Sequence, residues 1–409
     1  MKEVKLIGHR FSRGTHDLRD FVTRNRIPAR WLDIELNREE VLKLCVDNDV
    51  RFDCLPAAIL PNGDVVHEPS VGHLAECLGV AHAPACKHYD LMIIGAGPAG
   101  LAGAVYAASE GLRTVLVERR ATGGQAGQSS RIENYLGFPL GVSGQELSER
   151  ATDQAHRFGV ETLLGCTVEG VEAHGSGRVV GLADGTQVSG SCVLIASGVN
   201  YRQMQAPGFE AMTGAGVYYG ASVLEAKACV GQQVAVIGAG NSAGQAAVHL
   251  AKYAGKARLL IRGGDIRKSM SSYLVDQIEE IPNIEVQTGT VATQAIGSDK
   301  LLGLTITPTG DAKPENIPCD ACFIFIGAVP ETGWLGDGIA VDDHGFVLSG
   351  ADARQSELWP LDREPYSLET TIPGVFVAGD VRARSMKRVA SAVGEGSTAI
   401  SLVHQYLND

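Results

Sequence analysis

Three segments of the chain carry glycine and acidic residues at spacings that suit nucleotide binding. In the first, Gly95, Gly97 and Gly100 form a G-x-G-x-x-G turn directly after an apolar strand and at the start of a helix. Such glycines let the backbone approach a pyrophosphate, which then lies at the positive N-terminal end of the helix. Glu118 ends the next apolar stretch, where a carboxylate accepts hydrogen bonds from a ribose. This segment predicts a dinucleotide site.

A second glycine turn, with Gly238, Gly240 and Ala243 in the same frame, follows later in the chain. Its second strand ends on Arg262 instead of an acid, and Arg267 follows shortly after. Guanidinium groups bind a ribose 2′-phosphate, which an acid would repel. The segment therefore predicts NADPH in preference to NADH, although arginines on a glycine-rich turn also suit a solvated surface.

The third segment is a Gly-Asp turn near the C-terminus. Gly379 and Asp380 end a short apolar strand, and a long helix is expected to follow from near Val389. We expect Asp380 to bind the ribityl chain of a flavin and the helix N-terminus to face the flavin ring. Together with the two glycine turns, this segment predicts a flavoprotein that binds FAD and NADPH.

These segments and their neighbours resemble the low-molecular-weight thioredoxin reductases among the pyridine-nucleotide disulfide oxidoreductases. The resemblance spans residues 89–409, with GAGPAG at 95–100, GGQ at 123–125, IENYLGFP at 132–139, IGAGNSA at 237–243, FIGAVPET at 325–332 and VFVAGD at 375–380. It implies hydride transfer from NADPH to FAD, a homodimer, and a hinge entered at Ala196-Ser197-Gly198. The cofactor contacts expected for FAD are Gly95, Gly97, Pro98, Ala99, Gly100, Glu118, Gly124, Gln125, Asn134, Gly379, Asp380 and Val389, and those for NADPH are Gly238, Gly240, Asn241, Ser242, Ala243, Arg262 and Arg267.

One part of the family pattern is missing. Thioredoxin reductases carry a C-x-x-C just before the strand of the NADPH module, but the matching stretch GVYYGASVLEAKACVGQQVAVIG contains a single cysteine, Cys229. Ala221, Ser222 and Val223 lie near the matching positions. We therefore expect electrons to pass to an external non-thiol acceptor, either a protein or a small molecule.

A C-x-x-C does occur elsewhere, at Cys319 and Cys322. The pair leads into a strand, with Cys319 expected at the strand entrance and Cys322 buried. It lacks the helix N-terminus that lowers a thiol pKa, so we interpret it as structural. Two alternatives stay open: a disulfide reductase that uses atypical or partner cysteines, and a flavin or nucleotide redox sensor with a docking domain.

The first 80 residues alternate apolar and helical stretches in the order βαβαββα, with a hairpin expected at Asn62-Gly63. This order resembles the thioredoxin/glutaredoxin fold, with Pro56 at the position of that family's cis-proline. Ser12 and Thr15 stand where a redox-active member carries cysteines, so we expect no thiol–disulfide exchange there. An unrelated small α/β domain stays open as the alternative.

The expected fold class is α/β, with two Rossmann-like nucleotide-binding domains, one inserted in the other, and the N-terminal thioredoxin-like domain. A chain of 409 residues suits two or three domains at roughly 150 residues each. The expected limits are 1–80 for the thioredoxin-like domain, 81–88 for a linker, 89–203 and 328–409 for the FAD-binding domain, and 204–327 for the NADPH-binding domain.

The composition argues against some classes of binding partner and predicts the cellular compartment. A formal charge of −12 opposes binding to nucleic acid or anionic lipid, because either needs a basic face. No N-terminal segment has the pattern of a secretion signal, and glycines interrupt the most apolar runs, so we expect a cytoplasmic protein without a membrane partner. The nine cysteines lie scattered in apolar contexts, as reduced thiols do, and no second pair at ligand spacing accompanies Cys319 and Cys322, so no metal is expected.

Overall fold

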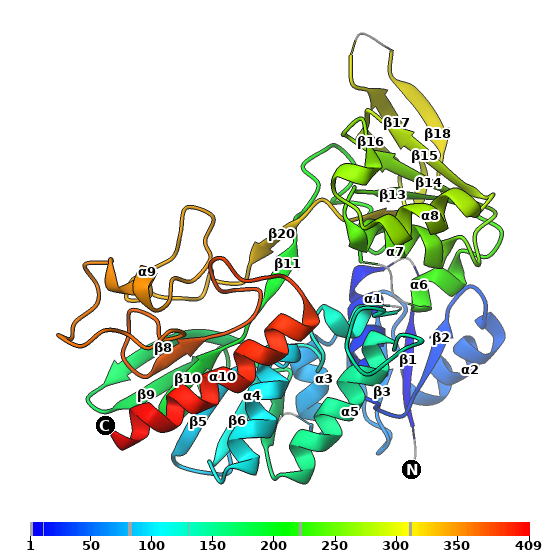
Figure 1. Cartoon of the computed structure of the whole chain (residues 1–409). Coiled ribbons are helices and arrows are strands. Elements are labelled where there is room, and N and C mark those ends of the chain that lie inside the picture. Colours follow the sequence, from blue (N-terminus) through cyan, green and yellow to red (C-terminus); the bar gives the residue numbers. More distant parts are fainter. Residues whose placement is uncertain (1–2, 11, 81–83, 130, 221–222, 311–312) are drawn as a thin grey trace.

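Three parts make up the chain, and each is built on a sheet with its own helices (Figure 1). The computed structural model describes residues 3–10, 12–80, 84–129, 131–220, 223–310 and 313–409. The N-terminal part, in blue, lies beside the cyan and red part and below the green and yellow part (Figure 1).

The N-terminal part contains a four-stranded sheet with the order β2-β1-β3-β4. β1 and β2 run parallel, and the other neighbours run antiparallel. The elements are β1 (Val4–Gly8), α1 (Arg13–Arg24), β2 (Ala29–Asp33), α2 (Arg38–Asn48), β3 (Ala57–Ile59), β4 (Val65–His67) and α3 (Val71–Cys77). The βαβαββα order and the hairpin at Asn62-Gly63 are those expected from the sequence. The Leu55–Pro56 peptide bond is cis, and Pro56 lies beside Gly14 at the start of α1.

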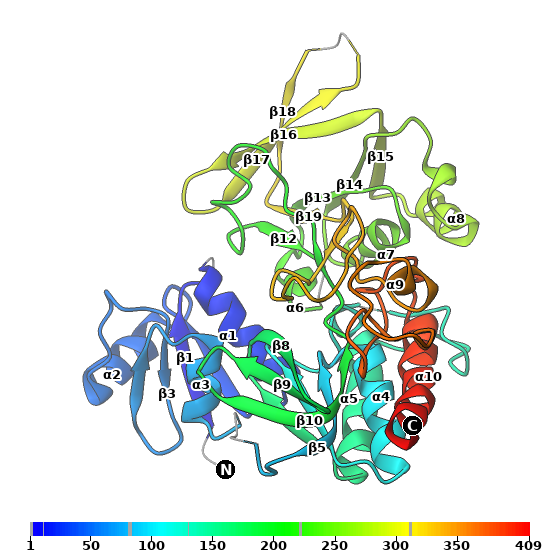
Figure 2. The same cartoon turned by 90° about the vertical axis from the view of Figure 1, so that its left-hand side faces the viewer.

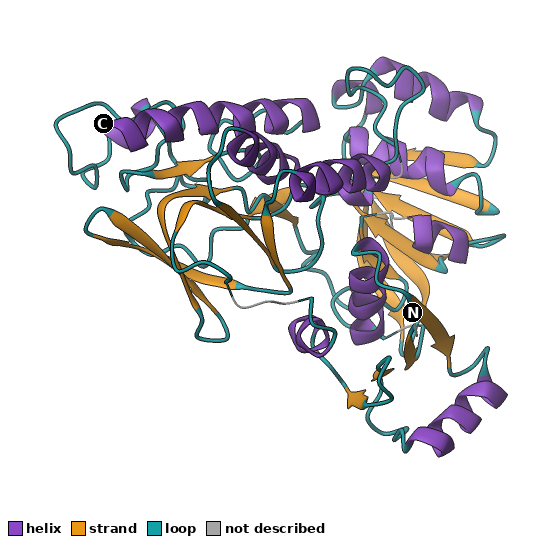
Figure 3. Cartoon of the chain, turned by 90° about the horizontal axis from the view of Figure 1, so that it is seen from below, coloured by secondary structure: helices purple, strands orange, loops and turns teal. Residues whose placement is uncertain are grey.

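The second part is built on a sheet with the order β7-β6-β5-β10-β9-β8, in which β21 also pairs with β10. Its strands are β5 (Tyr89–Ile94), β6 (Thr114–Glu118), β7 (Glu161–Leu164), β8 (Val168–His174), β9 (Gly177–Leu182), β10 (Gln187–Ile195) and β21 (Val375–Val377). Its helices are α4 (Pro98–Ser109), α5 (Gly144–Arg157), α9 (Ala351–Arg354) and α10 (Val389–Asn408), with a short 3-10 helix, η1 (Ala126–Gln128). Figure 3 shows α10, which ends at the C-terminus, running along one side of these strands.

The contact between α4 and α10 depends on glycine. A Cβ on Gly396 would lie 2.1 Å from the carbonyl oxygen of Ala99, and one on Gly103 would lie 3.5 Å from the carbonyl oxygen of Gly396. The backbones of the two helices therefore approach each other closely above the sheet. This packing fixes the start of α4, where the first glycine turn lies.

The third part contains the parallel sheet β12-β19-β13-β14-β15 and a separate antiparallel sheet β16-β17-β18. Its strands are β12 (Val217–Tyr219), β13 (Gln233–Ile237), β14 (Lys256–Ile261), β15 (Ile284–Thr288), β16 (Thr290–Gly297), β17 (Leu301–Pro308), β18 (Glu315–Pro318) and β19 (Ala321–Ile324). Its helices are α6 (Val223–Ala228), α7 (Asn241–Leu250) and α8 (Ser272–Glu280), with a 3-10 helix, η2 (Ile266–Lys268).

Two short strands connect the second and third parts. The chain leaves through β11 (Val199–Tyr201) and returns through β20 (Ala328–Pro330), and these strands pair antiparallel (Figure 1). The third part is therefore an insertion in the second, as expected from the repeated glycine turns. The domain limits given above stay predictions.

All nine cysteines are free thiols. Within the described ranges, no helix is both long enough and apolar enough to cross a membrane. Among the same residues, no three His, Cys, Asp or Glu side chains gather as they would around a metal ion.

Candidate cofactor-binding site

The first glycine turn joins β5 to α4, and the backbone requires two of its glycines. Gly95 has a φ of +101°, and a Cβ there would lie 2.5 Å from the carbonyl oxygen of Ala196. A Cβ on Gly100 would lie 1.9 Å from the carbonyl oxygen of Gly95. Both positions therefore need a residue without a side chain.

Gly97, the middle glycine, differs because the space beside it is open. It is the N-cap of α4, with Pro98 at the first helical position, and a Cβ there would meet no atom within 4 Å. Gly124 approaches it from the GGQ segment, since a Cβ on Gly124 would lie 3.0 Å from the Cα of Gly97. The N-terminus of α4, where backbone N–H groups lack partners in the helix, thus faces a space that fits an anionic pyrophosphate.

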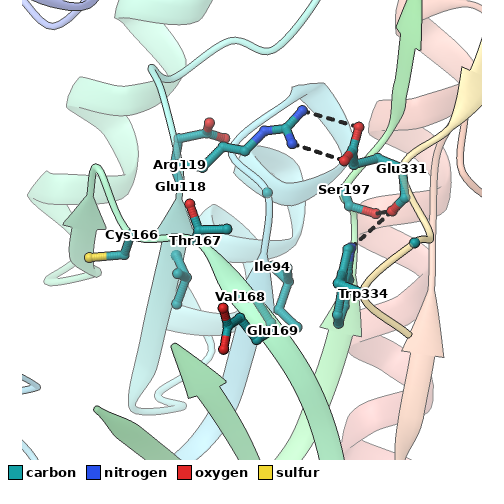
Figure 4. Close-up of a pocket in the computed structure, with 13 residues that line it drawn as sticks. Ile94, Glu118, Arg119, Cys166, Thr167, Val168, Glu169, Ser197, Glu331 and Trp334 are labelled. Carbon is teal, nitrogen blue, oxygen red and sulfur yellow. Dashed lines mark hydrogen bonds and ion pairs between the residues drawn. The ribbon is translucent and has the colours of Figure 1, made fainter. Parts of the chain in front are cut away.

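The carboxylate of Glu118 lies at the end of β6, next to the same turn. Its Oε2 accepts a hydrogen bond from the backbone N–H of Ala96 at 2.8 Å, and its Oε1 accepts one from that of Arg120 at 2.8 Å. These bonds fix the carboxylate and leave each oxygen able to accept a further bond from a hydroxyl. Glu118 lines a cavity of about 560 Å³, a size typical of ligand pockets (Figure 4).

One wall of this cavity is an ion-pair network that the sequence motifs did not reveal. Arg119 donates to both carboxylate oxygens of Glu331, at 2.9 and 3.1 Å (Figure 4). The backbone carbonyl of Glu331 accepts hydrogen bonds from the Ser197 hydroxyl at 2.9 Å and from the Trp334 indole at 3.0 Å. The network ties the end of β6 to the segments that follow β10 and β20. The sequence offered only their positions as a sign of this network, because Arg119 directly follows Glu118 and Glu331 lies in the FIGAVPET motif.

The Gly-Asp turn after β21 lies against the start of α4. Gly379 has a φ of +80°, and a Cβ there would lie 2.9 Å from the Cβ of Ala99. Its backbone N–H donates to Glu395 of α10 at 2.7 Å, another contact that the sequence did not predict. Burial raises the pKa of Asp380. The structure thus brings this turn to the first glycine turn, and α10 begins at Val389 as expected.

Two further predicted flavin contacts lie in loops. The Gln125 side chain donates to the carbonyl oxygen of Val199 at 2.6 Å, which places it beside β11. Asn134 is exposed, in the loop between η1 and α5. The structure therefore places Gln125 against β11, directly after Gly124, and leaves Asn134 at the protein surface.

The second glycine turn, between β13 and α7, repeats the geometry of the first. Gly238 has a φ of +150°, and a Cβ there would lie 2.5 Å from the carbonyl oxygen of Phe325. Gly240 is the N-cap of α7, and a Cβ there would meet no atom within 4 Å, as at Gly97. Ala243 is fully buried beneath the turn. The repeat fits a second pyrophosphate.

The two arginines predicted to select NADPH have different surroundings. Arg262 directly follows β14 and is exposed, whereas the guanidinium of Arg267 binds Glu279 at 2.6 Å. Arg267 therefore shares its charge with an acid, which the sequence did not indicate. Ser242 is exposed in the first turn of α7, and Asn241 makes two hydrogen bonds, at 2.8 and 2.9 Å, to the N-cap residue of α8.

The stretch that replaces the family's cysteine pair runs from β12 to α6. Ala221 and Ser222 lie outside the described residues, and Val223 is the first residue of α6. Tyr218 stacks on Phe323, with ring centroids 5.3 Å apart, so it packs within the third part. Gly220 lies next to the second part, since a Cβ there would lie 3.3 Å from the side-chain oxygen of Gln128.

The cysteines of the third part are poorly suited to redox exchange, which requires a thiolate. Cys229 is buried, its thiol donates to the carbonyl oxygen of Glu225 at 3.2 Å, and burial raises its pKa to about 12. Cys319 and Cys322 are both buried, Cys319 more deeply than a position at a strand entrance suggested. Burial raises the pKa of Cys319 to about 12 and that of Cys322 well above its usual value.

Comparisons with known proteins agree with this geometry. Residues 89–396 match the family model described as pyridine nucleotide-disulphide oxidoreductase. The chain is 30% identical over 325 residues to the thioredoxin reductase of Listeria monocytogenes, a match that covers 79% of this chain and 95% of that protein. It is 27% identical over 319 residues to a component of the alkyl hydroperoxide reductase of Staphylococcus epidermidis, which covers 78% of this chain and 59% of that protein.

Solved structures show the same likeness. The thioredoxin reductase of T. acidophilum matches with a TM-score of 0.71 at 25% identity, covering 79% of this chain and 100% of that one. That of Lactococcus lactis, in its FR conformation, matches with a TM-score of 0.70 at 27% identity, covering 78% of this chain and 99% of that one.

Proposed function

The chain belongs to the pyridine nucleotide-disulphide oxidoreductase family, and from this premise we propose that it passes electrons from NADPH to an external acceptor that is not a thiol or a disulfide. It is an NADPH-dependent flavoprotein oxidoreductase of the thioredoxin-reductase-like type, whose cofactors are FAD and NADPH. When bound, these cofactors supply the hydride chemistry, and the residues of the chain bind and orient them.

For FAD, we assign the pyrophosphate to the N-terminus of α4 at Gly97, where a Cβ would meet no atom. Glu118, oriented by two backbone N–H groups, accepts hydrogen bonds from the ribose next to it. Asp380, beside the same helix start, binds the ribityl chain. The approach of Gly124 to Gly97, and of Gly379 to Ala99 in the first turn of α4, supports this assignment.

For NADPH, we assign the pyrophosphate to the N-terminus of α7 at Gly240 and the 2′-phosphate to Arg262. Arg267 contributes less, because Glu279 already compensates its charge. The other expected contacts, Asn241, Ser242 and Ala243, belong to the first turn of α7.

The observation that carries the choice of acceptor is the lack of a usable thiol in the stretch from β12 to β13. That stretch contains a single cysteine, Cys229, which is buried and has a raised pKa. A disulfide relay needs two cysteines and a thiolate that can attack. Cys319 and Cys322 are also buried with raised pKa values, which disfavours a relay through the second pair.

We propose that residues 1–80 form a thioredoxin-like domain without redox activity. The βαβαββα order and the β2-β1-β3-β4 sheet support this relationship. Ser12 and Thr15 occupy the ends of the segment where such a domain carries its cysteines. The FAD-binding domain then comprises 89–203 and 328–409, and the NADPH-binding domain comprises 204–327.

We further propose that the chain is a homodimer, in keeping with its resemblance to thioredoxin reductases, and that it acts in the cytoplasm. The nine free cysteines are consistent with a reducing compartment.

Stopped-flow spectroscopy of the purified holoenzyme tests the function in two steps. Mixing with NADPH should bleach the flavin absorbance rapidly, and the reduced enzyme should then be reoxidised by at least one quinone, small oxidant or electron-transfer protein. Thioredoxin and a model disulfide should leave it reduced, while a thioredoxin reductase with its own substrate verifies the assay. Rapid reoxidation by either disulfide would contradict the proposed acceptor class, and absence of bleaching would contradict the proposed function as a whole.

A further inference from the structure

Helix α1 of the N-terminal part contacts both of the other parts of the chain. Its first half lies against α6 and the segment before β12 (Figures 1 and 2). His16 and Glu225 of α6 form a hydrogen bond of 2.7 Å, and both side chains are mostly buried, with exposed fractions of 32% and 12%. The backbones also meet, because a Cβ on Gly214 would lie 3.1 Å from the Cα of Arg13.

The charge on His16 strengthens this contact. Burial opposes a positive charge on the imidazole, but the carboxylates of Asp17, at 4.0 Å, and of hydrogen-bonded Glu225 outweigh it and raise the pKa of His16 to about 10. His16 is therefore protonated at neutral pH, and its contact with Glu225 is an ion pair. The charged and titratable groups around the His16–Glu225 pair are Asp17, Arg19 and Asp20 of α1 and Tyr218 of β12.

The other end of α1 binds the part that carries the first glycine turn. The guanidinium of Arg24, 11% exposed, donates to the carbonyl oxygens of Gly124 at 2.9 Å and Thr122 at 3.3 Å. The side chain of Asn25 donates to the carbonyl oxygen of Arg120 at 2.9 Å. One helix thus reaches the GGQ segment, proposed above as a flavin contact, and α6, the element next to the missing cysteine pair.

The face of α1 that meets the third part lacks the cysteines that a redox-active thioredoxin-like domain would carry there. It begins at the segment from Ser12 to Thr15, where a thioredoxin-like domain would carry its own cysteines. Thr15 is 1% exposed, and its hydroxyl has no hydrogen-bond partner among the described residues. The N-terminal part therefore presents to the stretch beside α6 the end that a thiol protein would present, but without thiols.

We propose that residues 1–80, which lack a cysteine pair at the start of α1, permanently cover the surface formed by α6 and the segment before β12, here called the α6 face. They thereby keep thiol proteins off the α6 face and hold the two nucleotide-binding parts in one relative orientation. The proposal rests on the proposed function only in its account of which partners are kept away. The fixed orientation of the two nucleotide-binding parts follows from the contacts at the two ends of α1 alone. Electrons must then leave by a route that does not require the α6 face.

Hydrogen–deuterium exchange on the full-length holoenzyme tests this proposal. The double variant His16→Ala/Arg24→Ala removes a contact at each end of α1. We expect amides in peptides covering α6 and residues 122–128 to exchange at least about tenfold faster than in the unmodified protein, because local opening controls their exchange. The matched control is Arg30→Ala, since Arg30 pairs at 2.8 Å with Glu40 inside the N-terminal part and both side chains are exposed.

A second variant guards against loss of fold in the N-terminal part. Glu225→Gln leaves residues 1–80 intact and should accelerate exchange in α6 and in α1 alone. Unprotected α6 amides in the unmodified protein, or equal exchange in the double variant and in Arg30→Ala, would overturn the proposal. Because exchange does not depend on turnover, the two proposals can fail separately. If NADPH does not reduce the flavin but the α6 amides are protected, the proposed function is contradicted and the proposed role of residues 1–80 is supported.

Discussion

The replacement Gly97→Ala should weaken the binding of FAD while leaving the stability of the fold almost unchanged. Gly97 has a φ of −72° and a Cβ there would meet no protein atom within 4 Å, so alanine fits both the backbone and the space. Alanine is a poorer N-cap than glycine, and the change should lower the free energy of unfolding by at most about 1 kcal/mol. The added methyl nevertheless enters the space assigned to the pyrophosphate of FAD.

The loss of affinity follows from the hydrogen bonds that a methyl group would lengthen. A phosphate oxygen displaced by a carbon atom loses at least one bond to a backbone N–H, and a bond to a charged group contributes about 1.5–3 kcal/mol. At about 1.4 kcal/mol for each factor of ten, the Kd for FAD should rise about 10- to 100-fold. Gly100→Ala is the contrasting change, because its Cβ would lie 1.9 Å from the carbonyl oxygen of Gly95 and must move the backbone.

The assay is flavin fluorescence quenching on the apoprotein, with unfolding measured on the same samples. Gly97→Ala should bind FAD weakly and keep its free energy of unfolding within about 1 kcal/mol of the unmodified apoprotein, whereas Gly100→Ala should lower it by about 1–3 kcal/mol. Gly240→Ala, the equivalent change in the second turn, should keep FAD and weaken NADPH. A Kd for FAD within about threefold of the original in Gly97→Ala would refute the placement of the pyrophosphate.

Three further predictions concern the nicotinamide cofactor, the buried cysteines and the interface of α1. Arg262→Ala should raise the Kd for NADPH about tenfold with little effect on NADH, and Arg267→Ala should have a smaller effect; equal losses for both cofactors in stopped-flow reduction would argue against 2′-phosphate binding. Cys319→Ala/Cys322→Ala should keep NADPH consumption with any working acceptor within twofold, and loss of turnover in a folded, FAD-loaded variant would show that the pair is redox-active. Because the pKa of His16 is raised from 6.5 to about 10, its stabilising contribution is complete below pH 6.5 and is lost as the pH rises through about 10. The difference in Tm between the unmodified protein and His16→Gln should therefore shrink across that interval, and a constant difference would contradict the assignment.

Features that depend on local backbone rules could be predicted from the sequence. Gly95 and Gly238 adopt positive φ values that only glycine accepts readily, so the motifs correctly predicted tight backbone turns at these positions, while their contact with cofactors stays a prediction. The alternation of apolar strands and helices likewise predicted the insertion of one nucleotide-binding unit in the other. These signals are short in range and need no knowledge of which segments meet in space.

Features that depend on contacts between distant segments could not be predicted in this way. Arg119 and Glu331 lie 212 positions apart, and His16 and Glu225 lie 209 apart, so no spacing rule connects either pair. Arg267 was expected to be available to a phosphate, but the fold of α8 brings Glu279 to it. The burial of Cys319 has the same origin, because the core formed around β19 covers it.

The pairing of β11 with β20 has a consequence for the way the chain folds. The backbone N–H of Arg202 donates to the carbonyl oxygen of Gly327 at 2.9 Å, so the two ends of the insertion meet once it is folded. β10 and β21 must pair across the whole insertion, as Val193 with Val375, and closing a long unfolded loop has an entropic cost that slows such pairing. An insertion that folds first shortens the loop that remains to be closed. We therefore expect the third part to act as an early folding unit on which completion of the central sheet depends.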